Sequence, residues 1–178
     1  MRQPLNACFR ESGQALILGL CMLLVFLALA TALVDGYALV EARNWGYQVA
    51  QQAALAGVSA GRRWDSVADG CMELDEGRSL ETAVTVLESE LGARGLSGAL
   101  YDVRILPEAF GGRMPGFPPQ SVRLGGWNAA WTEDEPAVGV YLSFPIQTFL
   151  LSFFGRPTIP IHVFASASVA QPAGGCLP

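Results

Sequence analysis

The sequence has little of what nucleic-acid-binding proteins and metalloproteins use. It contains one histidine, His162, and no lysine; all eleven basic residues are arginines, and the formal net charge is −5. A mildly acidic chain is a poor match for a phosphate backbone, so we expect no nucleic acid among its partners. One histidine and no Cys-x-x-Cys pair exclude the usual structural zinc sites.

Motifs that bind cofactors are also missing. The chain has no phosphate-binding loop and no dinucleotide-binding glycine pattern. His162 lies near Ser166 and Ser168 on a predicted strand, where the polarity of an exposed strand face explains all three better than catalysis does. The acidic stretch from Asp69 to Glu76 lacks the ligand spacing of an EF-hand loop. We therefore expect no enzyme activity, no catalytic residues, no cofactor and no metal site.

Charge is absent from a long run near the N-terminus. From Ala15 to Val34, twenty residues carry no formal charge and include no proline. A helix of this length spans about 30 Å, which is the thickness of a bilayer core. Arg2 and Arg10 precede the run, which favours a cytoplasmic N-terminus and an extracytoplasmic C-terminus.

A cleaved signal peptide is the alternative interpretation of this run. Ala28-Leu29-Ala30 fits the small-x-small pattern of a cleavage site, and cleavage there would release an exported binding or adhesion domain. The apolar run continues beyond this site, however, and exceeds the usual signal-peptide core of about 7–15 residues. We favour a retained anchor in the cell membrane.

The helical pattern continues past the apolar run. Apolar and polar residues recur three or four positions apart, and alanine, the best helix former, is frequent. We expect one helix from about Ser12 to about Ser59, with an interaction face that includes Trp45, Gln52 and Leu55. Through this N-terminal helix the chain would form a homo- or hetero-oligomer.

Several elements in this region occur in a recognisable order. Gly13-Gln14-Ala15-Leu16 precedes the apolar run, Asp35-Gly36-Tyr37 follows it, and the helix then carries QQAALAG, residues 51–57. This order resembles the N-terminal region of TadE/TadG-like proteins, the minor pilin-like, membrane-anchored components of the Tad (Flp) pilus assembly system. The resemblance covers roughly residues 10 to 61 and implies that the partners are other proteins of pilus or secretion machinery.

The resemblance also implies a possible leader cleavage between Gly13 and Gln14. Pilin-type substrates usually carry glutamate at the fifth mature position, but here that position is Leu18 and Glu11 lies before the cut. This departure favours an uncleaved anchor over a processed pseudopilin.

The distal part has mixed helix and strand patterns. Leu80, Val84, Leu87 and Leu91 form an apolar stripe that predicts a helix at about 80–93, with Ser79 as its N-cap. Alternating patterns predict strands at 101–105, 138–144 and 159–169, and SVRLGGW (121–127) is a further short candidate. Segments 61–78 and 107–120 are predicted to be a connector and a loop.

Two features of the distal part leave alternatives open. Residues 145–155, PIQTFLLSFFG, are strongly apolar but too short to span a bilayer. They would form a short buried helix, enter the outer leaflet or bind a partner. Cys71 and Cys176 are the two cysteines beyond the apolar run, and an extracytoplasmic location favours a disulfide between them.

Together these patterns predict an α+β protein with a pilin-like layout. Residues 1–13 would be a cytoplasmic leader, 14–34 a transmembrane helix, 35–60 its amphipathic extension and 61–178 an extracytoplasmic domain containing a second helix and a small antiparallel sheet. We expect a structural or assembly component of a Tad-type pilus or related secretion machinery, which acts through protein–protein contacts.

Overall fold

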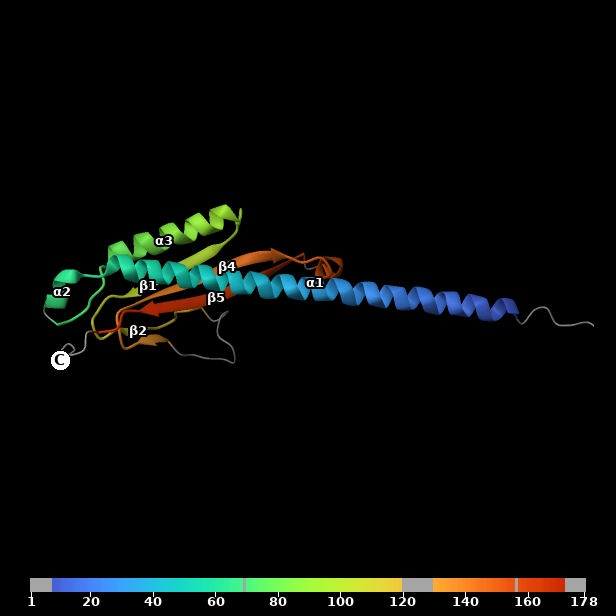
Figure 1. Cartoon of the computed structure of the whole chain (residues 1–178), viewed down its shortest axis with the longest axis horizontal. Coiled ribbons are helices and arrows are strands. Elements are labelled where there is room, and N and C mark those ends of the chain that lie inside the picture. Colours follow the sequence, from blue (N-terminus) through green and yellow to red (C-terminus); the bar gives the residue numbers. More distant parts are fainter. Residues whose placement is uncertain (1–7, 69, 120–129, 156, 172–178) are drawn as a thin grey trace, which may run out of the picture. The chain divides into compact units, whose positions relative to one another are not determined.

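A computed structural model of the chain describes residues 8–68, 70–119, 130–155 and 157–171 (Figure 1). It has the α+β composition and the pilin-like layout predicted from the sequence. The chain divides into two compact units: Met1–Val40 with Gln147–Thr158, and Glu41–Ile146 with Ile159–Pro178. We call the second unit the α+β unit.

The first helix, α1, extends without a break from Cys8 to Gly61. This confirms the single long helix predicted from about Ser12 to about Ser59. Its continuity follows from composition, because no proline occurs between these positions and alanine and leucine dominate. The helix contributes to both units, changing from one to the other at Val40 and Glu41.

Two further helices belong to the α+β unit. They are α2, Trp64–Ala68, and α3, Glu76–Ala93. The predicted start of α3 was wrong: its N-cap is Asp75, whose Oδ1 accepts a hydrogen bond from the backbone N–H of Arg78 at 2.8 Å. Ser79 is instead fully buried inside the helix.

The main sheet has three strands in the order β1-β4-β5, all within the α+β unit except their ends. The strands are β1, Leu100–Leu106, β4, Ala137–Gln147, and β5, Thr158–Ser168. β1 and β4 are antiparallel, with Val103 opposite Val140. All three strands were predicted, because apolar residues recur at every second position along each of them.

A second, two-stranded sheet escaped prediction. It pairs β2, Gly112–Met114, with β3, Trp131–Glu133, in antiparallel register. Both strands have three residues, too few to display an alternating pattern, and β2 lies in the segment 107–120 that was predicted to be a loop. The candidate strand at 121–127 lies outside the described residues.

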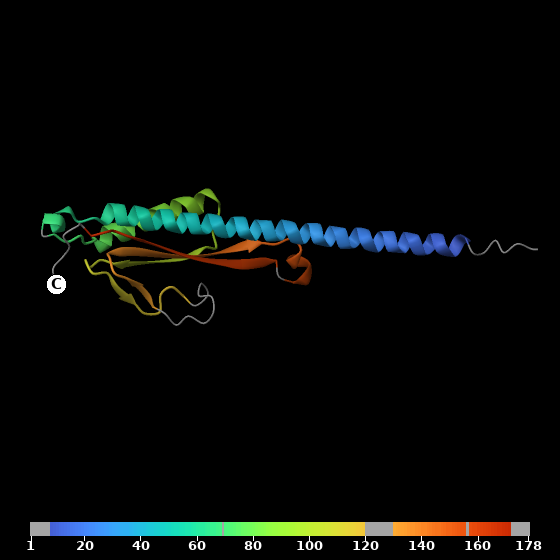
Figure 2. The same cartoon turned by 60° about the horizontal axis from the view of Figure 1, so that its bottom comes forward.

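The main sheet is covered on both faces, as the turned view in Figure 2 shows for α1 and the β2–β3 sheet. Alternate residues of β4, Val138, Val140, Leu142 and Phe144, join α1 and α3 in one apolar cluster. Residues of the opposite strand face, Ala137 and Tyr141, join a second cluster with residues of the β2–β3 region. The second cluster contains Leu106, Phe117 and Trp131, with Met114 and Phe164 packed against it.

Candidate functional surface on the first helix

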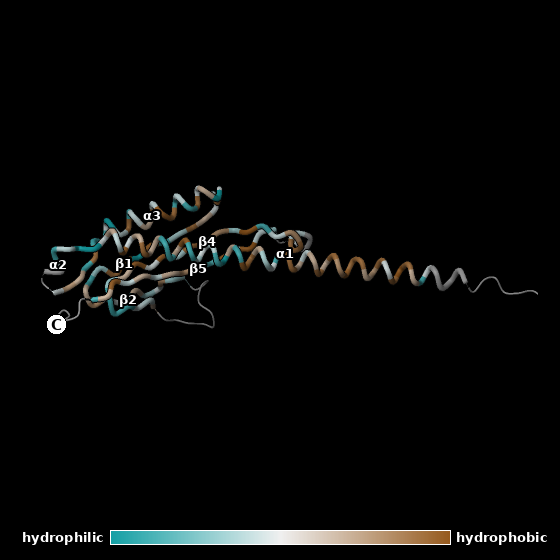
Figure 3. The backbone as a smooth tube through the Cα atoms, viewed as in Figure 1, coloured by the Kyte–Doolittle hydropathy of each residue, from teal (hydrophilic) through white to brown (hydrophobic). Residues whose placement is uncertain are grey.

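The first half of α1 exposes apolar side chains on all sides. Figure 3 shows the apolar colouring along this half of the helix. Among the described residues, Gly13–Gly61 is the one helix long and apolar enough to cross a membrane, and a signal sequence would share these properties. The hydroxyl of Thr31 donates to the carbonyl oxygens of Leu27 and Ala28, both at 3.0 Å, so this polar group is satisfied within the helix. The exposed large apolar residues include Leu16, Ile17, Leu20, Leu23, Leu24, Val25, Phe26, Leu27, Leu29, Leu33 and Val34.

Gly13 and Gln14, the predicted cleavage position, lie inside α1 and are exposed. A side chain added at Gly13 would meet nothing within 4 Å. The backbone here is helical, and cleavage at this position stays a prediction.

The segment between β4 and β5 is held to the first half of α1 by one carboxylate. Asp35 is buried, and its Oδ1 and Oδ2 accept hydrogen bonds from the backbone N–H groups of Phe149 and Leu150 at 2.8 and 2.7 Å. We call Gln147–Thr158 the β4–β5 lobe. It contains the short 3-10 helix η2, Leu151–Phe154. A short buried helix in this segment was one of the predicted alternatives, and its burial stays a prediction. Phe149 is 61% exposed.

The second half of α1 packs through its smallest side chains. Ala50, Ala53 and Ala54 are fully buried, and Gly57 is buried beside them. A methyl group at Gly57 would lie 2.9 Å from the backbone oxygen of Ser79 and 3.2 Å from Cβ of Ala83. The small residues of QQAALAG therefore allow α1 and α3 to approach closely within the chain itself.

The three residues of the predicted interaction face have different environments. Trp45 is half-buried and packs edge-on against Phe144, with ring centroids 5.3 Å apart, while the Arg94 guanidinium lies 4.4 Å from the centre of its ring. Gln52 and Leu55 are exposed. Trp45 thus stabilises its own domain, and only the other two remain open to solvent. Their contact with a partner stays a prediction.

The exposed side of this helical half is polar and rich in amides. Its members in the described chain are Glu41, Asn44, Gln48, Gln51, Gln52, Leu55 and Ser59. Glutamine side chains donate and accept hydrogen bonds, and Leu55 adds an apolar centre. Such a surface suits a water-exposed protein contact, and we call it the glutamine face.

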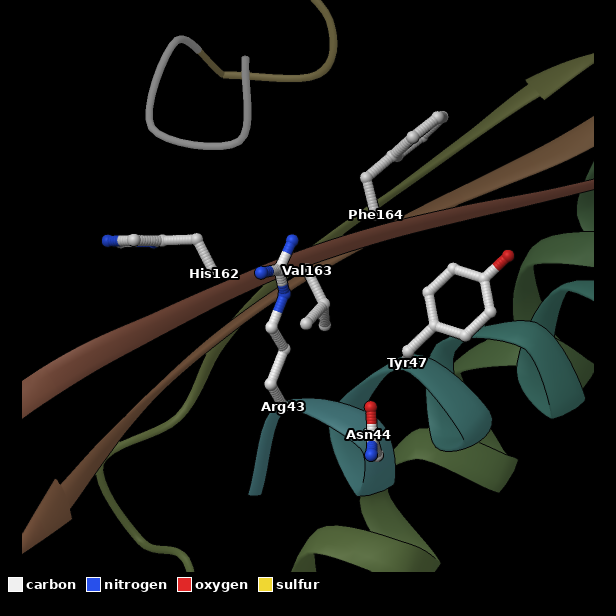
Figure 4. A pocket seen from close by; sticks show the side chains of 6 residues that line it. All are labelled: Arg43, Asn44, Tyr47, His162, Val163 and Phe164. Carbon is white, nitrogen blue, oxygen red and sulfur yellow. The ribbon is translucent and has the colours of Figure 1, made fainter. Parts of the chain in front are cut away.

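A hollow of about 280 Å³ separates α1 from β5 next to this face. It is lined by Arg43, Asn44 and Tyr47 of the helix and by His162, Val163 and Phe164 of the strand (Figure 4). His162 Nδ1 lies 2.9 Å from the Tyr141 hydroxyl, so one nitrogen of the ring is already hydrogen-bonded. The side chains do not form a recognisable catalytic group.

The serines that follow His162 along β5 bond elsewhere. The hydroxyl of Ser166 donates to Glu133 at 2.9 Å, and that of Ser168 donates to Glu135 at 3.0 Å. Within the described ranges, no group of three or more His, Cys, Asp or Glu residues could hold a metal ion. These hydroxyls link β5 to the segment that begins with β3.

Sequence prediction missed one hydrolase-like pattern. The stretch GVSAG, Gly57–Gly61, matches Gly-x-Ser-x-Gly. In hydrolases that pattern sits on a sharp strand-to-helix turn that exposes the serine. Here all five residues lie inside α1, and both glycines face α3, so the stretch does not form a nucleophile turn.

An arginine-rich hollow of about 460 Å³ lies where α1 ends and α3 begins. Arg63 pairs with Asp65 at 3.3 Å and with Glu73 at 3.1 Å. The pKa of the Asp65 carboxyl is below its usual value because its backbone N–H and the Arg63 side chain donate to it. The acidic connector thus forms internal ion pairs. Arg62, Trp64, Asp75 and Arg78 complete the lining.

Cys71 is one of the two cysteines of the predicted disulfide. Cys71 is half-buried and disulfide-bonded. The predicted partner, Cys176, lies outside the described residues, so the pairing stays a prediction. Cys21, in the apolar half of α1, is a free and exposed thiol.

Asp35 is the other feature whose role the sequence did not reveal. Its position directly after the apolar run marked it as part of a family pattern, but its partners lie more than a hundred residues away. Comparisons with known protein families, with curated proteins and with solved structures find no match to this chain.

Proposed function

We propose that this chain is a single-pass membrane protein that serves as a structural or assembly component of a Tad (Flp) type pilus or a related secretion machinery. It acts through protein–protein contacts, with its N-terminus in the cytoplasm and its α+β unit outside the membrane. The proposal involves no small-molecule chemistry.

The observation that carries the anchoring is the change of environment along α1. The same uninterrupted helix exposes large apolar residues before Asp35 and buries alanine and glycine after Glu41. Exposing the apolar side chains of the first half to water would cost about 25 cal/mol of free energy for each Å² of apolar surface. A bilayer can surround this half of the helix, because its side chains are apolar and its backbone hydrogen bonds are all made within the helix.

Assignment to the pilus system is supported by the resemblance to TadE/TadG-like proteins. The Gly13-Gln14-Ala15 start, the Asp35-Gly36-Tyr37 exit and QQAALAG carry it. The close packing at Gly57 gives the last element a physical role in the fold. The glutamine face provides a surface for another protein beside that packed side.

Membrane extraction followed by intact mass measurement tests the anchor. We expect the full-length chain to resist alkaline extraction and to begin at its original N-terminus. A start at Gln14 would indicate processing by a prepilin peptidase while keeping the anchor. A soluble product beginning at Thr31 would overturn the anchor and support the alternative, an exported binding or adhesion domain released after Ala30.

Site-specific photocrosslinking in the native host tests the protein contact. A photoreactive residue at Gln52 or Leu55 should capture another membrane or pilus protein, or a second copy of the chain. The same residue at Thr85, which is exposed on α3, is the matched control. Equal capture from Thr85, or none from either position on the glutamine face, would contradict the proposed contact surface.

A further inference from the structure

The β4–β5 lobe belongs structurally with the apolar half of α1. Although it lies between two strands of the main sheet, Gln147–Thr158 forms one compact unit with Met1–Val40 and not with the α+β unit. Within the lobe, the backbone N–H of Thr148 donates to the carbonyl oxygen of Pro157 at 2.9 Å, which closes the excursion at its base. The lobe is therefore a defined attachment on the helix.

Asp35 and the lobe satisfy each other's polar groups. Phe149 and Leu150 directly precede η2, and their backbone N–H groups need acceptors when they are shielded from water. Asp35 supplies both of its oxygens to two consecutive amides, those of Phe149 and Leu150, and it is buried by this contact. Neither the carboxylate nor these amides then depend on water.

Among the described residues of the lobe, one large apolar side chain is exposed, that of Phe149, at 61%. No charged residue occurs from Pro145 to Gly155, and Arg156 is the one charged residue in the sequence of the lobe. Gln147, Ser152 and Thr158 are polar residues exposed beside Phe149. On the helix of the same unit, Leu33, Val34 and Tyr37 are also largely exposed. The apolar surface of the helix thus continues past Asp35, and the lobe bonded to Asp35 adds the exposed ring of Phe149.

The length of the apolar run places Asp35 at a definite depth. The twenty uncharged residues from Ala15 to Val34 extend about 30 Å as a helix, so Asp35 follows at the edge of the hydrocarbon core. Carboxylates are costly at that depth unless they are hydrogen-bonded, and the lobe provides the bonds. Aromatic side chains such as Tyr37 and Phe149 are typical of the same layer.

We propose that the β4–β5 lobe is a second membrane contact, which inserts Phe149 and its neighbours into the lipid–water interface where α1 leaves the bilayer. This inference rests on the proposed anchoring. The occupant of the apolar surface is lipid and not a second protein, because the surface is continuous with the part of α1 assigned to the bilayer. The lobe would fix the depth and rotation of α1 in the membrane.

Spin labelling of the full-length chain in phospholipid nanodiscs tests the lobe and the anchor separately. Cys8 and Cys21 are replaced by serine, and a single new cysteine is introduced as Leu24→Cys, Phe149→Cys or Ser89→Cys. Ser89 is an exposed residue of α3 and serves as the aqueous control. Accessibility to oxygen, which partitions into lipid, is compared with accessibility to a water-soluble nickel chelate.

We expect the ratio of oxygen to nickel accessibility at positions 24 and 149 to exceed that at position 89 several-fold, with position 149 intermediate. If position 24 is in lipid and position 149 matches position 89, the lobe inference is wrong and the anchor stands. If position 24 also matches position 89, the anchoring fails as well.

Asp35→Asn tests whether the carboxylate holds the lobe. The amide keeps one carbonyl oxygen but loses the second acceptor and the charge, so the label at position 149 should gain mobility and nickel accessibility several-fold. Asp102→Asn, at a solvent-accessible carboxylate paired with Arg104, is the matched control and should change neither. An unchanged label in Asp35→Asn would refute the role of this carboxylate.

Discussion

Gly57→Ala isolates the close approach of α1 and α3. Alanine is favoured over glycine in a helix by about 1 kcal/mol, so propensity alone predicts stabilisation. The new methyl group would meet the backbone oxygen of Ser79 at 2.9 Å and Cβ of Ala83 at 3.2 Å. Neither atom can move by changing a side-chain rotamer, so the helices must separate. Overpacking of this kind costs about 1–3 kcal/mol.

Subtracting the helix gain from the overpacking cost, we expect Gly57→Ala to lower the free energy of unfolding by up to about 2 kcal/mol despite its better propensity. For a domain of this size each kcal/mol moves the melting temperature by about 4 °C. Thermal unfolding of the full-length protein in detergent micelles, followed by tryptophan fluorescence, measures the change.

Gly92→Ala is the matched control for this prediction. Gly92 also lies in a helix, α3, but a methyl group there would meet nothing within 4 Å. It should leave the melting temperature unchanged or raise it by a few degrees. If Gly57→Ala melts as high as Gly92→Ala, the close helix approach is not a constraint and the explanation of the small residues fails.

Three further predictions concern the same unit. Phe144→Ala should cost about 3–5 kcal/mol in denaturant unfolding, because the ring is fully buried against Trp45; Phe144→Leu should cost less. Cys71→Ser and Cys176→Ser should lower the melting temperature equally and abolish its sensitivity to reductant, whereas unequal effects would contradict the predicted pairing. The Tyr101 hydroxyl donates to the Glu88 carboxylate at 2.7 Å, which raises the pKa of Tyr101 above 10.0. Its stabilising contribution is therefore complete below pH 10 and is lost as the pH rises through the higher folded-state pKa; Glu88→Gln should shift phenolate absorbance to lower pH.

The sequence determined the elements that carry a long or regular pattern. An unbroken apolar run followed by alanine-rich turns is sufficient for α1, since propensity and the absence of proline act locally. Strands β1, β4 and β5 were equally visible, because apolar residues recur at every second position along each of them. The three-residue strands β2 and β3 were not, since their pairing depends on each other and on the cluster around Trp131.

The start of α3 shows how packing overrides a local signal. Ser79 has the chemistry of an N-cap, yet Asp75 takes that role and Ser79 faces Gly57 and Gly61. The predicted stripe fails in part for the same reason: Leu87 and Leu91 are buried, but Leu80 is exposed while Ala83 is buried. Small residues were needed at the contact, and a pattern of large apolar residues does not reveal them.

The sequence by itself determined that this chain has one long helix, apolar in its first half, and an α+β portion after it. The tertiary structure decided which residues of the long helix remain exposed and so available for contact with a partner. It packed the half-buried Trp45 against Phe144 and left Gln52 and Leu55 exposed. It also bonded Asp35 to Phe149 and Leu150 across more than a hundred residues. Such contacts depend on distances in space, and composition and periodicity report only on neighbours along the chain.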